Sequence, residues 1–536
     1  MTFRTRHFKK IITGLAAASS LALAGVLAAT VGNTSPGPVS TVADAAGAGA
    51  ASAGAGAAGA GTVAGSSWGP AQEIPGTGAL AGPDGLARVS SVSCASPGNC
   101  VAGGEYATKS SSVDYAYHGF IASQVNGTWG TAQQVPGLAA LDKSGQAGVS
   151  VVSCSSPGNC SAGGTYGLPN SGPASRASAY VVSEVNGKWG QAEPVAGLAT
   201  LNTGEDANID QMSCASAGNC TAGGSFHLST KECCSAQGFV VSEVHGTWDK
   251  VQQVPGLAAL NVDRDADVIS VSCTEPGNCA AGGTYMNGRG AFQGYVADQK
   301  NGVWGKAREV PGLAALNKGS ETSGGAATGA VSCASPGNCA AGGTYSLAND
   351  NAEAFVASER NGVWGKAAEV NGASTLKKDG QAKVESVSCA SPGNCAAVGQ
   401  AYQVINSGED QNTYTTAFVV NEVKGTWGKA VKVSGLSTLN LGNDAELQTV
   451  DCPSAGDCVA GGFYTTANGR QLALVISEVN GTWSVREPIS GLAALTGTSG
   501  RSGISAVSCA APGKCSIGGY YLAPDTLARP FVASRG

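Results

Sequence analysis

Two landmarks recur along the chain at intervals of about sixty residues. Tryptophan stands at eight positions spaced by 56 to 63 residues: Trp68, Trp129, Trp189, Trp248, Trp304, Trp364, Trp427 and Trp483. Eight cysteine pairs keep the same period: Cys94 and Cys100, Cys154 and Cys160, Cys214 and Cys220, Cys273 and Cys279, Cys333 and Cys339, Cys389 and Cys395, Cys452 and Cys458, Cys509 and Cys515. Self-similarity at a fixed period of this length indicates a repeat architecture.

Each repeat contains four short segments with strand character. In the second repeat they are residues 149–154, the phrase NCSAGGTY, the alternating run 179–185 and the segment 188–195 that begins at the tryptophan. Ser-Pro-Gly-Asn turns join the first two strands. Asn-Gly dipeptides, the strongest two-residue hairpin signal, join the last two. The pattern predicts an all-β fold, an eight-bladed β-propeller with four antiparallel strands in each blade.

The two ends of the repeat region complement each other. The region begins at residue 67 with a fourth-strand phrase, SSWGPAQEIPG, and the sequence stops after a third-strand phrase, PFVASRG. We expect the N-terminal strand to pair into the last blade and close the ring, which hides two exposed strand edges. An open solenoid is the alternative, but it calls for capping units instead of complementary half-blades.

The six-residue cysteine spacing predicts a disulfide across each hairpin. Two cysteines at facing ends of adjacent strands lie within reach of one another. A metal site is the weaker alternative, because two thiols fill only half of a tetrahedral coordination sphere. Cys233 and Cys234 fall outside the repeat pattern, and we expect them to form a vicinal disulfide or to pair with another chain.

The first 31 residues resemble an export signal. Four basic residues precede an uncharged stretch rich in Ala and Leu, and Ala43-Asp44-Ala45 is a candidate cleavage site. An uncleaved membrane anchor is the alternative, because about 20 apolar residues suffice to span a bilayer. Residues 32–66 form a Gly/Ala/Ser-rich linker that we expect to be flexible, and residues 67–536 form the propeller. The chain is therefore expected to be secreted or held at the cell surface, where disulfides persist.

Charge is sparse and slightly negative. Charged residues make up 13% of the chain and the net charge is −6. Neutralisation of phosphates needs clustered Lys and Arg, so we expect no nucleic-acid partner. Beyond the leader, we expect no membrane partner, and we expect the protein to be a monomer.

Chain direction assigns the loops to two faces. The turns after odd-numbered strands are short and nearly uniform, whereas the loops between strands two and three diverge at 107–119, 167–178, 227–238 and 401–416. Divergent loops on a constant scaffold predict a recognition surface, although surface loops also drift without function. Tyrosines there are candidates for stacking on sugar rings: Tyr115, Tyr117, Tyr402 and Tyr414.

A second candidate site lies where each first strand begins. Eight residues before the first cysteine, five repeats carry a carboxylate or amide: Gln146, Asp206, Asp265, Gln381 and Asp444. Leu86, Gly325 and Arg501 stand there in the other three. Such a ring could bind a polar ligand or a cation, or simply be solvated. Asp263, Asp265 and Asp267 have the spacing that begins a calcium loop, but the following glycine and distant glutamate are missing.

Catalytic patterns are scarce. The chain has four histidines and no G-x-S-x-G, H-E-x-x-H or phosphate-binding glycine loop. One glutamate precedes the outer turn in five repeats, and we interpret this recurrence as a fold device: Glu184, Glu243, Glu359, Glu422 and Glu478. We expect no catalytic residue and no cofactor.

The phrase VSC-x-SPGNC-x-AGG-x-Y … SE-x-NG-x-WG resembles secreted bacterial β-propeller repeat proteins, a group whose functions are largely uncharacterised. Two enzyme-bearing families are also similar in part. SEVNGTW (477–483) is similar to the turn of sialidase-type propellers, but it is one residue short and lacks the aspartate. Cys233-Cys234 looks like the vicinal disulfide of eight-bladed quinoprotein dehydrogenases, whose longer docking phrase is absent.

Together these patterns predict a secreted, disulfide-stabilised propeller that acts as a binding or scaffolding module. We expect a ligand on the variable-loop face, which could be a polysaccharide, a cell-wall component or a protein. The alternative is a propeller enzyme, either quinoprotein-like or glycan-processing.

Overall fold

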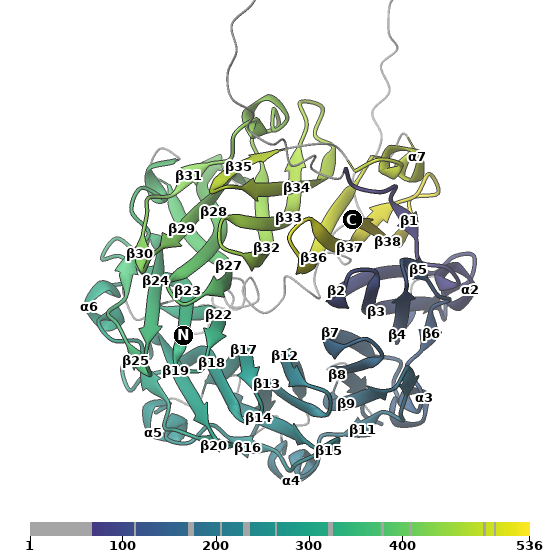
Figure 1. Ribbon diagram of the computed structural model, residues 1–536, viewed down its shortest axis with the longest axis horizontal. Helices are drawn as coiled ribbons and strands as arrows, with labels where there is room; N and C mark the ends of the chain where they lie inside the picture. The colour runs from purple at the N-terminus through teal and green to yellow at the C-terminus, as the bar shows by residue number, and fades with distance from the viewer. Residues whose placement is uncertain are drawn as a thin grey trace, which may run out of the picture.

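The protein is a ring of eight β-sheets around a central opening (Figure 1). The computed structural model describes residues 67–536 except 112–113, 170–175, 204–205, 229–235, 263–264, 320–324, 377–379, 408–409, 486–488 and 498–499. The predicted leader (1–31), the linker (32–66), Asp263 and the pair Cys233 and Cys234 lie outside the described residues. Within them, no helix is long and apolar enough to cross a membrane.

Each sheet is one blade with its first strand innermost, as predicted. The innermost strands are β2 (Leu86–Ser96), β7 (Gly148–Ser156), β12 (Ala207–Ser216), β17 (Ala266–Glu275), β22 (Ala327–Ser335), β27 (Gln381–Ser391), β32 (Ala445–Ser454) and β36 (Ser502–Ala511). The second strands are β3 (Asn99–Lys109), β8 (Asn159–Gly167), β13 (Asn219–His227), β18 (Asn278–Met286), β23 (Asn338–Ser346), β28 (Asn394–Ser407), β33 (Asp457–Thr465) and β37 (Lys514–Leu522). We number the blades 1 to 8 in this order.

The third strands follow antiparallel to the second. They are β4 (Tyr115–Val125), β9 (Ala177–Val185), β14 (Ala236–Val244), β19 (Phe292–Lys300), β24 (Ala352–Arg360), β29 (Asp410–Val423), β34 (Gln471–Val479) and β38 (Ala528–Arg535). The blade order is therefore inner to outer along the chain, which is the arrangement that the repeat predicts.

The fourth strand differs from the prediction because it is interrupted in most blades. Its two parts are β5 (Thr128–Trp129) and β6 (Gln133–Gln134), β10 (Lys188–Trp189) and β11 (Glu193–Pro194), β15 (Thr247–Trp248) and β16 (Gln252–Gln253), β20 (Val303–Trp304) and β21 (Arg308–Glu309), β25 (Val363–Trp364) and β26 (Ala368–Glu369), β30 (Thr426–Trp427) and β31 (Val431–Lys432); blade 7 has β35 (Thr482–Val485). At the interruption the chain hydrogen-bonds to the preceding blade: Ala192 N donates to Pro136 O at 2.7 Å.

A short helix follows each fourth strand, which the sequence did not predict. These are α2 (Thr77–Ala81), α3 (Leu138–Leu141), α4 (Leu198–Leu201), α5 (Leu257–Leu260), α6 (Leu313–Leu316), η1 (Ser374–Leu376), η2 (Leu436–Thr438) and α7 (Leu492–Thr496). A glycine with positive φ begins the turn, as at Gly137 (φ 78°), and Leu138 then inserts into the core. A single turn is too short to leave a helical period in the sequence.

Ring closure is confirmed. β1 (Gln72–Glu73) pairs antiparallel with β38, with Gln72 opposite Val532 and Glu73 opposite Phe531. Trp68 forms a further bridge with Arg535. The last blade is therefore built from both ends of the repeat region, and its third strand is not left as an open edge.

The predicted hairpin disulfides are confirmed in all eight blades. Each joins a cysteine of the first strand to one of the second strand. In seven blades the two cysteines lie directly opposite one another in register, and in blade 7 the register shifts at this point. Bonds of this kind persist in an extracellular or otherwise oxidising environment. In the chain-entropy model each short loop contributes roughly 2 kcal/mol to stability.

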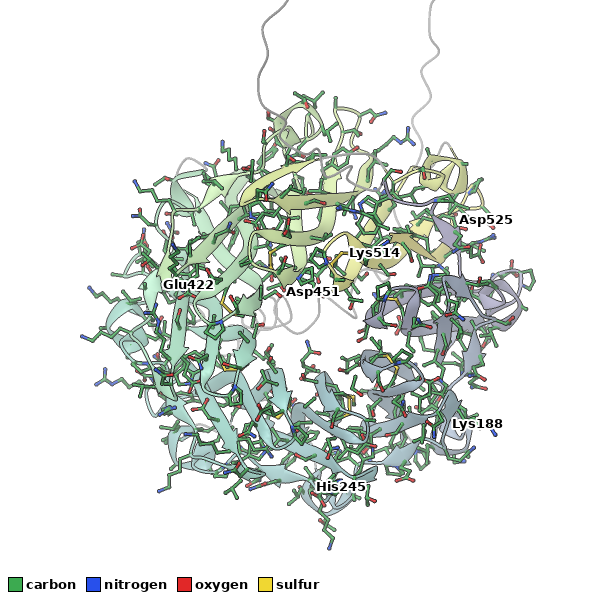
Figure 2. All side chains as sticks on the ribbon, in the orientation of Figure 1. Lys188, His245, Glu422, Asp451, Lys514 and Asp525 are labelled. Carbon is green, nitrogen blue, oxygen red and sulfur yellow. A yellow bond between two sulfur atoms is a disulfide. The ribbon has the colours of Figure 1, made fainter. Side chains whose placement is uncertain are left out.

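Adjacent blades are joined by a ring of hydrogen bonds beside the disulfides. In every blade the amide of the first cysteine donates, over 2.7–3.0 Å, to a side chain one residue before the cysteine of the neighbouring blade. That acceptor is Ser in seven blades and Asp451 in blade 7. Asp451 lies beside the central opening (Figure 2). The repeated Ser-Cys dipeptide therefore closes the ring as well as each hairpin.

Close packing between blades explains the Gly-Gly of the second strand. A Cβ on Gly518 would lie 2.6 Å from Val92 Cγ2 and 2.7 Å from Val89 Cγ1 of the next blade. Any side chain at that position would push two well-packed sheets apart. The core is thus distributed over the blade junctions, and it leaves the two faces of the ring available for other roles.

Candidate functional site

The hairpin turns confirm which loops share a face. Gly127 N of an Asn-Gly turn donates to Gly98 O of the Ser-Pro-Gly-Asn turn at 2.8 Å, and Asn126 N donates to Asn99 Oδ1 at 3.2 Å. Both turn types therefore lie together, and we call their side the disulfide face. The opposite side carries the divergent connections and is called the variable-loop face.

The four candidate tyrosines lie in strands instead of loops. Tyr115 and Tyr117 belong to β4, Tyr402 to β28 and Tyr414 to β29. The segment 401–416, expected to be a loop, continues the β28–β29 hairpin, with Ser407 opposite Asp410. The third strand of this blade is simply longer than the third strands of the other blades. All four side chains are half-buried.

Two of these tyrosines sit beside charged pairs of the inner strands. Burial raises the pKa of Tyr117, and Glu105 raises it further while Arg88 lowers it. Tyr402 donates from its hydroxyl to Gln381 Oε1 at 3.3 Å. Burial also raises the pKa of Tyr402, with Lys383 opposing the shift.

The five candidate carboxylates and amides lie at blade junctions. Gln146 bridges to Tyr117 and Asp206 to Ala177 of the preceding blade. Gln381 Oε1 accepts a hydrogen bond from Ala352 N at 3.0 Å, again from the preceding blade. Asp444 accepts from Thr415 in the same way, and Asp265 N donates to Asn261 Oδ1 at 2.8 Å. Gln146, Asp206, Gln381 and Asp444 therefore connect neighbouring blades on the variable-loop face, whereas the bond of Asp265 is local to the connection between blades 3 and 4.

The candidate calcium residues are described only in part. Burial raises the pKa of Asp265 to about 7, with a further contribution from Asp267. Burial raises the pKa of Asp267 as well. In the part of the chain that the structure describes, no three His, Cys, Asp or Glu side chains are grouped as a metal site. Because Asp263 lies outside that part, calcium binding stays a prediction.

Long charged and aromatic side chains gather on one side of the ring. We define the inner-strand cluster as six residues on the first and second strands of blades 6, 7, 8 and 1: Lys383, Glu385, Glu446, Tyr520, Arg88 and Glu105. Arg88 Nε lies 2.9 Å from Glu105 Oε1, and Lys383 pairs with Glu385. All of these side chains are half-buried.

The members of the cluster interact across three successive blade junctions. Burial raises the pKa of Glu446 in blade 7 to about 7, because Lys383 of blade 6 offsets only part of the penalty and Glu385 adds to it. Burial raises the pKa of Tyr520 in blade 8; Arg501 and Arg88 lower it, and Glu446 raises it. Carboxyl groups whose pKa values are strongly raised by burial and by neighbouring charges cluster at functional sites, so Glu446 marks this region as a candidate.

Tyr520 is held in place by its neighbours. Its hydroxyl accepts a hydrogen bond from Gln471 Nε2 at 2.8 Å. The residue opposite on the inner strand is Gly503, and a Cβ there would lie 3.0 Å from Tyr520 Cε1. The glycine thus leaves room for the tyrosine ring.

The corresponding positions of blades 2 to 5 carry short side chains. Where blades 1, 6 and 7 have Arg88, Lys383 and Glu446, and blade 8 has Gly503 opposite Tyr520, blades 2 to 5 have Gly148, Asn208, Asp267 and Ala327. We call the two innermost strands of blades 6, 7, 8 and 1 the charged arc, and those of blades 2 to 5 the short-residue arc. The backbone pairing is the same in both, so the difference lies in the side chains.

Sequence reasoning missed Lys383, Glu446, Phe463 and Tyr520. The signal was present, because the second strand has Thr in blades 2, 4 and 5 (Thr165, Thr284 and Thr344) where blades 7 and 8 have Phe463 and Tyr520. Such a departure becomes visible only when the strands are aligned by register. The loop sequences alone do not show this departure.

The recurrent glutamates are buried at blade junctions. Glu243 accepts from Ser183 Oγ at 2.7 Å and from Ser161 Oγ at 3.0 Å, both on the preceding blade. Ser183 in turn accepts from Trp248 Nε1 at 3.0 Å. Burial raises the pKa of Glu243. This Trp–Ser–Glu connection supports the interpretation of these glutamates as a fold device.

Comparisons with known proteins give likenesses of shape at low identity. No family model and no curated protein sequence matches the chain. An ulvan lyase from a new family of polysaccharide lyases shares 10% identity at a TM-score of 0.42, covering 88% of this chain and 94% of that one. The β-propeller domain of the Trilobed protease from Pyrococcus furiosus shares 8% (TM-score 0.38; 75% and 100% covered). The Hadza microbial sialidase shares 12% (TM-score 0.32; 68% and 74% covered).

Proposed function

We propose that this protein is an extracellular binding module that holds a polysaccharide at the charged arc, near the variable-loop face. The observation that carries the proposal is the inner-strand cluster. Long charged and aromatic residues occupy one side of a ring whose other side keeps short residues at the same register positions. Eight disulfides are compatible with an extracellular setting.

The chemistry of the cluster suits a sugar polymer. Half-buried aromatic side chains, Tyr520, Phe463 and Tyr402, offer ring faces for stacking. Lys383, Arg501 and Glu446 offer hydrogen bonds to hydroxyl and acidic groups of the polymer. Binding of a cell-wall component or of a protein is another outcome of the same test. We expect the protein to act as a monomer.

The repeat supplies its own substitutions for the test. Phe463→Thr and Tyr520→Thr introduce the residue that blades 2, 4 and 5 carry at this position, and Thr284→Ser in the short-residue arc is the matched control. Affinity electrophoresis against a polysaccharide panel should detect one retarding polymer. We expect the two aromatic substitutions to weaken retention at least tenfold and the control to leave it unchanged.

The outcome also tests the tyrosines proposed from the sequence. Changing Tyr117 and Tyr414 to Ala should weaken retention if the ligand extends onto the third strands. Absence of retention by every polysaccharide, or equal retention of the wild type and Tyr520→Thr, contradicts the proposal. Thermal melts of each variant separate loss of binding from loss of fold.

A glycan-processing activity is the second candidate, and the state of Glu446 favours it. A carboxyl with a pKa of about 7 can donate or accept a proton near neutral pH. Release of new sugar ends from the retained polymer, abolished in Glu446→Gln, would support this activity. Retention of the polymer without cleavage would leave the binding function alone. The quinoprotein-like alternative rests on Cys233 and Cys234 and stays a prediction.

A further inference from the structure

The disulfide face is nearly uniform, yet it carries a groove of about 590 Å³ between blades 3 and 4. The groove lies on the side opposite the proposed polysaccharide site. Its volume falls within the range of small-ligand pockets. It is lined by the outer turns of both blades and reaches inward to Cys220 and Cys279.

Residues that depart from the repeat consensus line this groove. His245 replaces the turn asparagine, Asp249 replaces the glycine after tryptophan, Glu275 replaces the serine before Pro-Gly, and Gln299 replaces the recurrent glutamate. Figure 2 shows His245 at the outer edge of the ring. Four departures around one groove, on a face that is otherwise repeated, mark it as distinct from a neutral blade junction.

Two of the lining side chains present buried polar atoms without a partner. Gln299 is 5% exposed, and its Nε2 donates to Gly302 O at 3.3 Å, which fixes the orientation of the amide. Among the described residues, neither Gln299 Oε1 nor the Nε1 of Trp304, also 5% exposed, has a hydrogen-bond partner. The two residues are directly opposite one another on β19 and β20. Opposed residues have Cβ atoms about 5 Å apart, so one ligand group can reach both.

The other blade junctions show how glutamine in place of glutamate affects the hydrogen bonds of the tryptophan and the volume of the groove. Where the glutamate is kept, as at Glu243, Ser183 donates to it and accepts from Trp248 Nε1. At the junction of blades 4 and 5, which keeps Glu359, the groove is about 70 Å³. Blade 1 has the same change, Gln124, and there Gln124 Oε1 and Trp129 Nε1 are also unpartnered in the described structure, beside a groove of about 330 Å³. Trp189 Nε1 lacks a partner too, although blade 2 keeps its glutamate.

We propose that the groove between blades 3 and 4 binds an acetamido sugar. A secondary amide presents one N–H and one C=O, which match the unpartnered acceptor of Gln299 and the unpartnered donor of Trp304. Buried polar atoms left unpaired are unfavourable, so a ligand that satisfies both gains binding free energy. The exposed rim of His245, Asp249 and Glu275 offers hydrogen bonds to sugar hydroxyls.

The test is isothermal titration of the full chain with a β-1,4-linked N-acetylglucosamine tetramer. The matching glucose tetramer, which lacks only the acetamido groups, is the ligand control. We expect saturable binding of the first and binding of the second at least tenfold weaker, because a site built for a hydrogen-bonding group rejects the analogue that lacks it.

Gln299→Glu restores the residue of five other blades, so the variant should fold. The new carboxylate gives Ser242 an acceptor, as Glu243 does for Ser183. The site then no longer matches the N–H and C=O of an acetamido group. We expect at least a tenfold loss of affinity with an unchanged melting temperature. Thr284→Ser, on the second strand of blade 4 and not among the residues that line the groove, should keep full affinity.

Four results would overturn the proposal. One is no binding of the acetamido tetramer, and another is equal binding of the two tetramers. The third is unchanged affinity in Gln299→Glu. Preferential binding of an N-acetylated peptide amide would also overturn it, since the amide would then be recognised in a peptide. Because the site is remote from the charged arc, failure here leaves the polysaccharide test unaffected.

Discussion

The charged arc and the short-residue arc are built on the same backbone but differ in their side chains. Both have the same strand pairing, the same bulge in the first strand and the same serine-type hydrogen bonds between blades. In the charged arc, opposite charges are paired: Arg88 with Glu105 and Lys383 with Glu385. In the short-residue arc, Asp210 and Asp267 bring like charges together at the junction of blades 3 and 4.

The fold is therefore specified by the residues common to all blades. Pairing across blades needs Ser-Cys, Gly-Gly and tryptophan, which recur around the ring. Positions on the inner strands that do not take part in this pairing can carry different residues. These residues differ between the charged arc and the short-residue arc. Departures from the repeat therefore locate positions that the fold does not require to be uniform.

The largest effect is expected from breaking a charge pair in the charged arc. Lys383→Ala, the residue of blade 5, leaves Glu385 and Glu446 without their cation, and we expect a loss of about 2 kcal/mol in the free energy of unfolding. Urea titration at pH 7 measures it. Adding Glu385→Ser, the bulge residue of blades 1, 2 and 8, should recover part of the loss. A double variant less stable than the single one would contradict the pairing.

A smaller effect of opposite sign is expected in the short-residue arc. Burial and Asp267 raise the pKa of Asp210 to about 7 in the folded protein, above the unfolded value of 3.8. The folded state therefore binds the proton more tightly, and stability declines as pH rises from about 4 to about 7. Asp210→Ser should raise stability by about 1–2 kcal/mol at pH 8, a value reduced for partial exposure, and by almost nothing near pH 4.

Equal gains for Asp210→Ser at the two pH values would show that the carboxyl is not the source. Asp210→Asn keeps the side-chain shape and serves as the control for packing. It should follow the same pH dependence as the serine variant.

The smallest effect is expected at Asp451, where one carboxylate replaces serine in the ring of inter-blade hydrogen bonds. Burial raises its pKa to about 6, although hydrogen bonds from Cys509 N, Cys452 N and Ser388 favour the charged form. Asp451→Ser restores the acceptor of the other blades. We expect a gain below about 1 kcal/mol at pH 8 that vanishes as pH falls to about 4. A large loss in thermal denaturation would mean that blade 7 needs the charge.

Much of the fold could be predicted from the sequence because its signals are local and repeated. Cysteine spacing, Asn-Gly turns and the truncated phrases at Trp68 and Phe531 gave the strand order, the disulfides and the ring closure. The short helices and the interrupted fourth strands were not predicted. They depend on hydrogen bonds to the preceding blade, such as Ala192 N to Pro136 O, which no single repeat reveals.

The candidate site was predicted less well. The sequence indicated the variable-loop face and two tyrosines, Tyr117 and Tyr402, that lie beside the inner-strand cluster. It did not indicate the cluster itself, because Glu446, Tyr520 and Arg88 come from three blades and meet only in the ring. It also treated the disulfide face as uniform, whereas Gln299 and Trp304 form a groove there.

Binding of a polysaccharide at the charged arc can be tested by hydrogen–deuterium exchange, with and without the polymer that affinity electrophoresis identifies. This measurement reports on both arcs in one experiment. We expect slower exchange in β27, β28, β32, β33, β36, β37, β2 and β3 when the polymer is bound, with exchange in β7, β12, β17 and β22 unchanged. Slower exchange confined to the short-residue arc, or no change in either arc at saturating polymer, would contradict it.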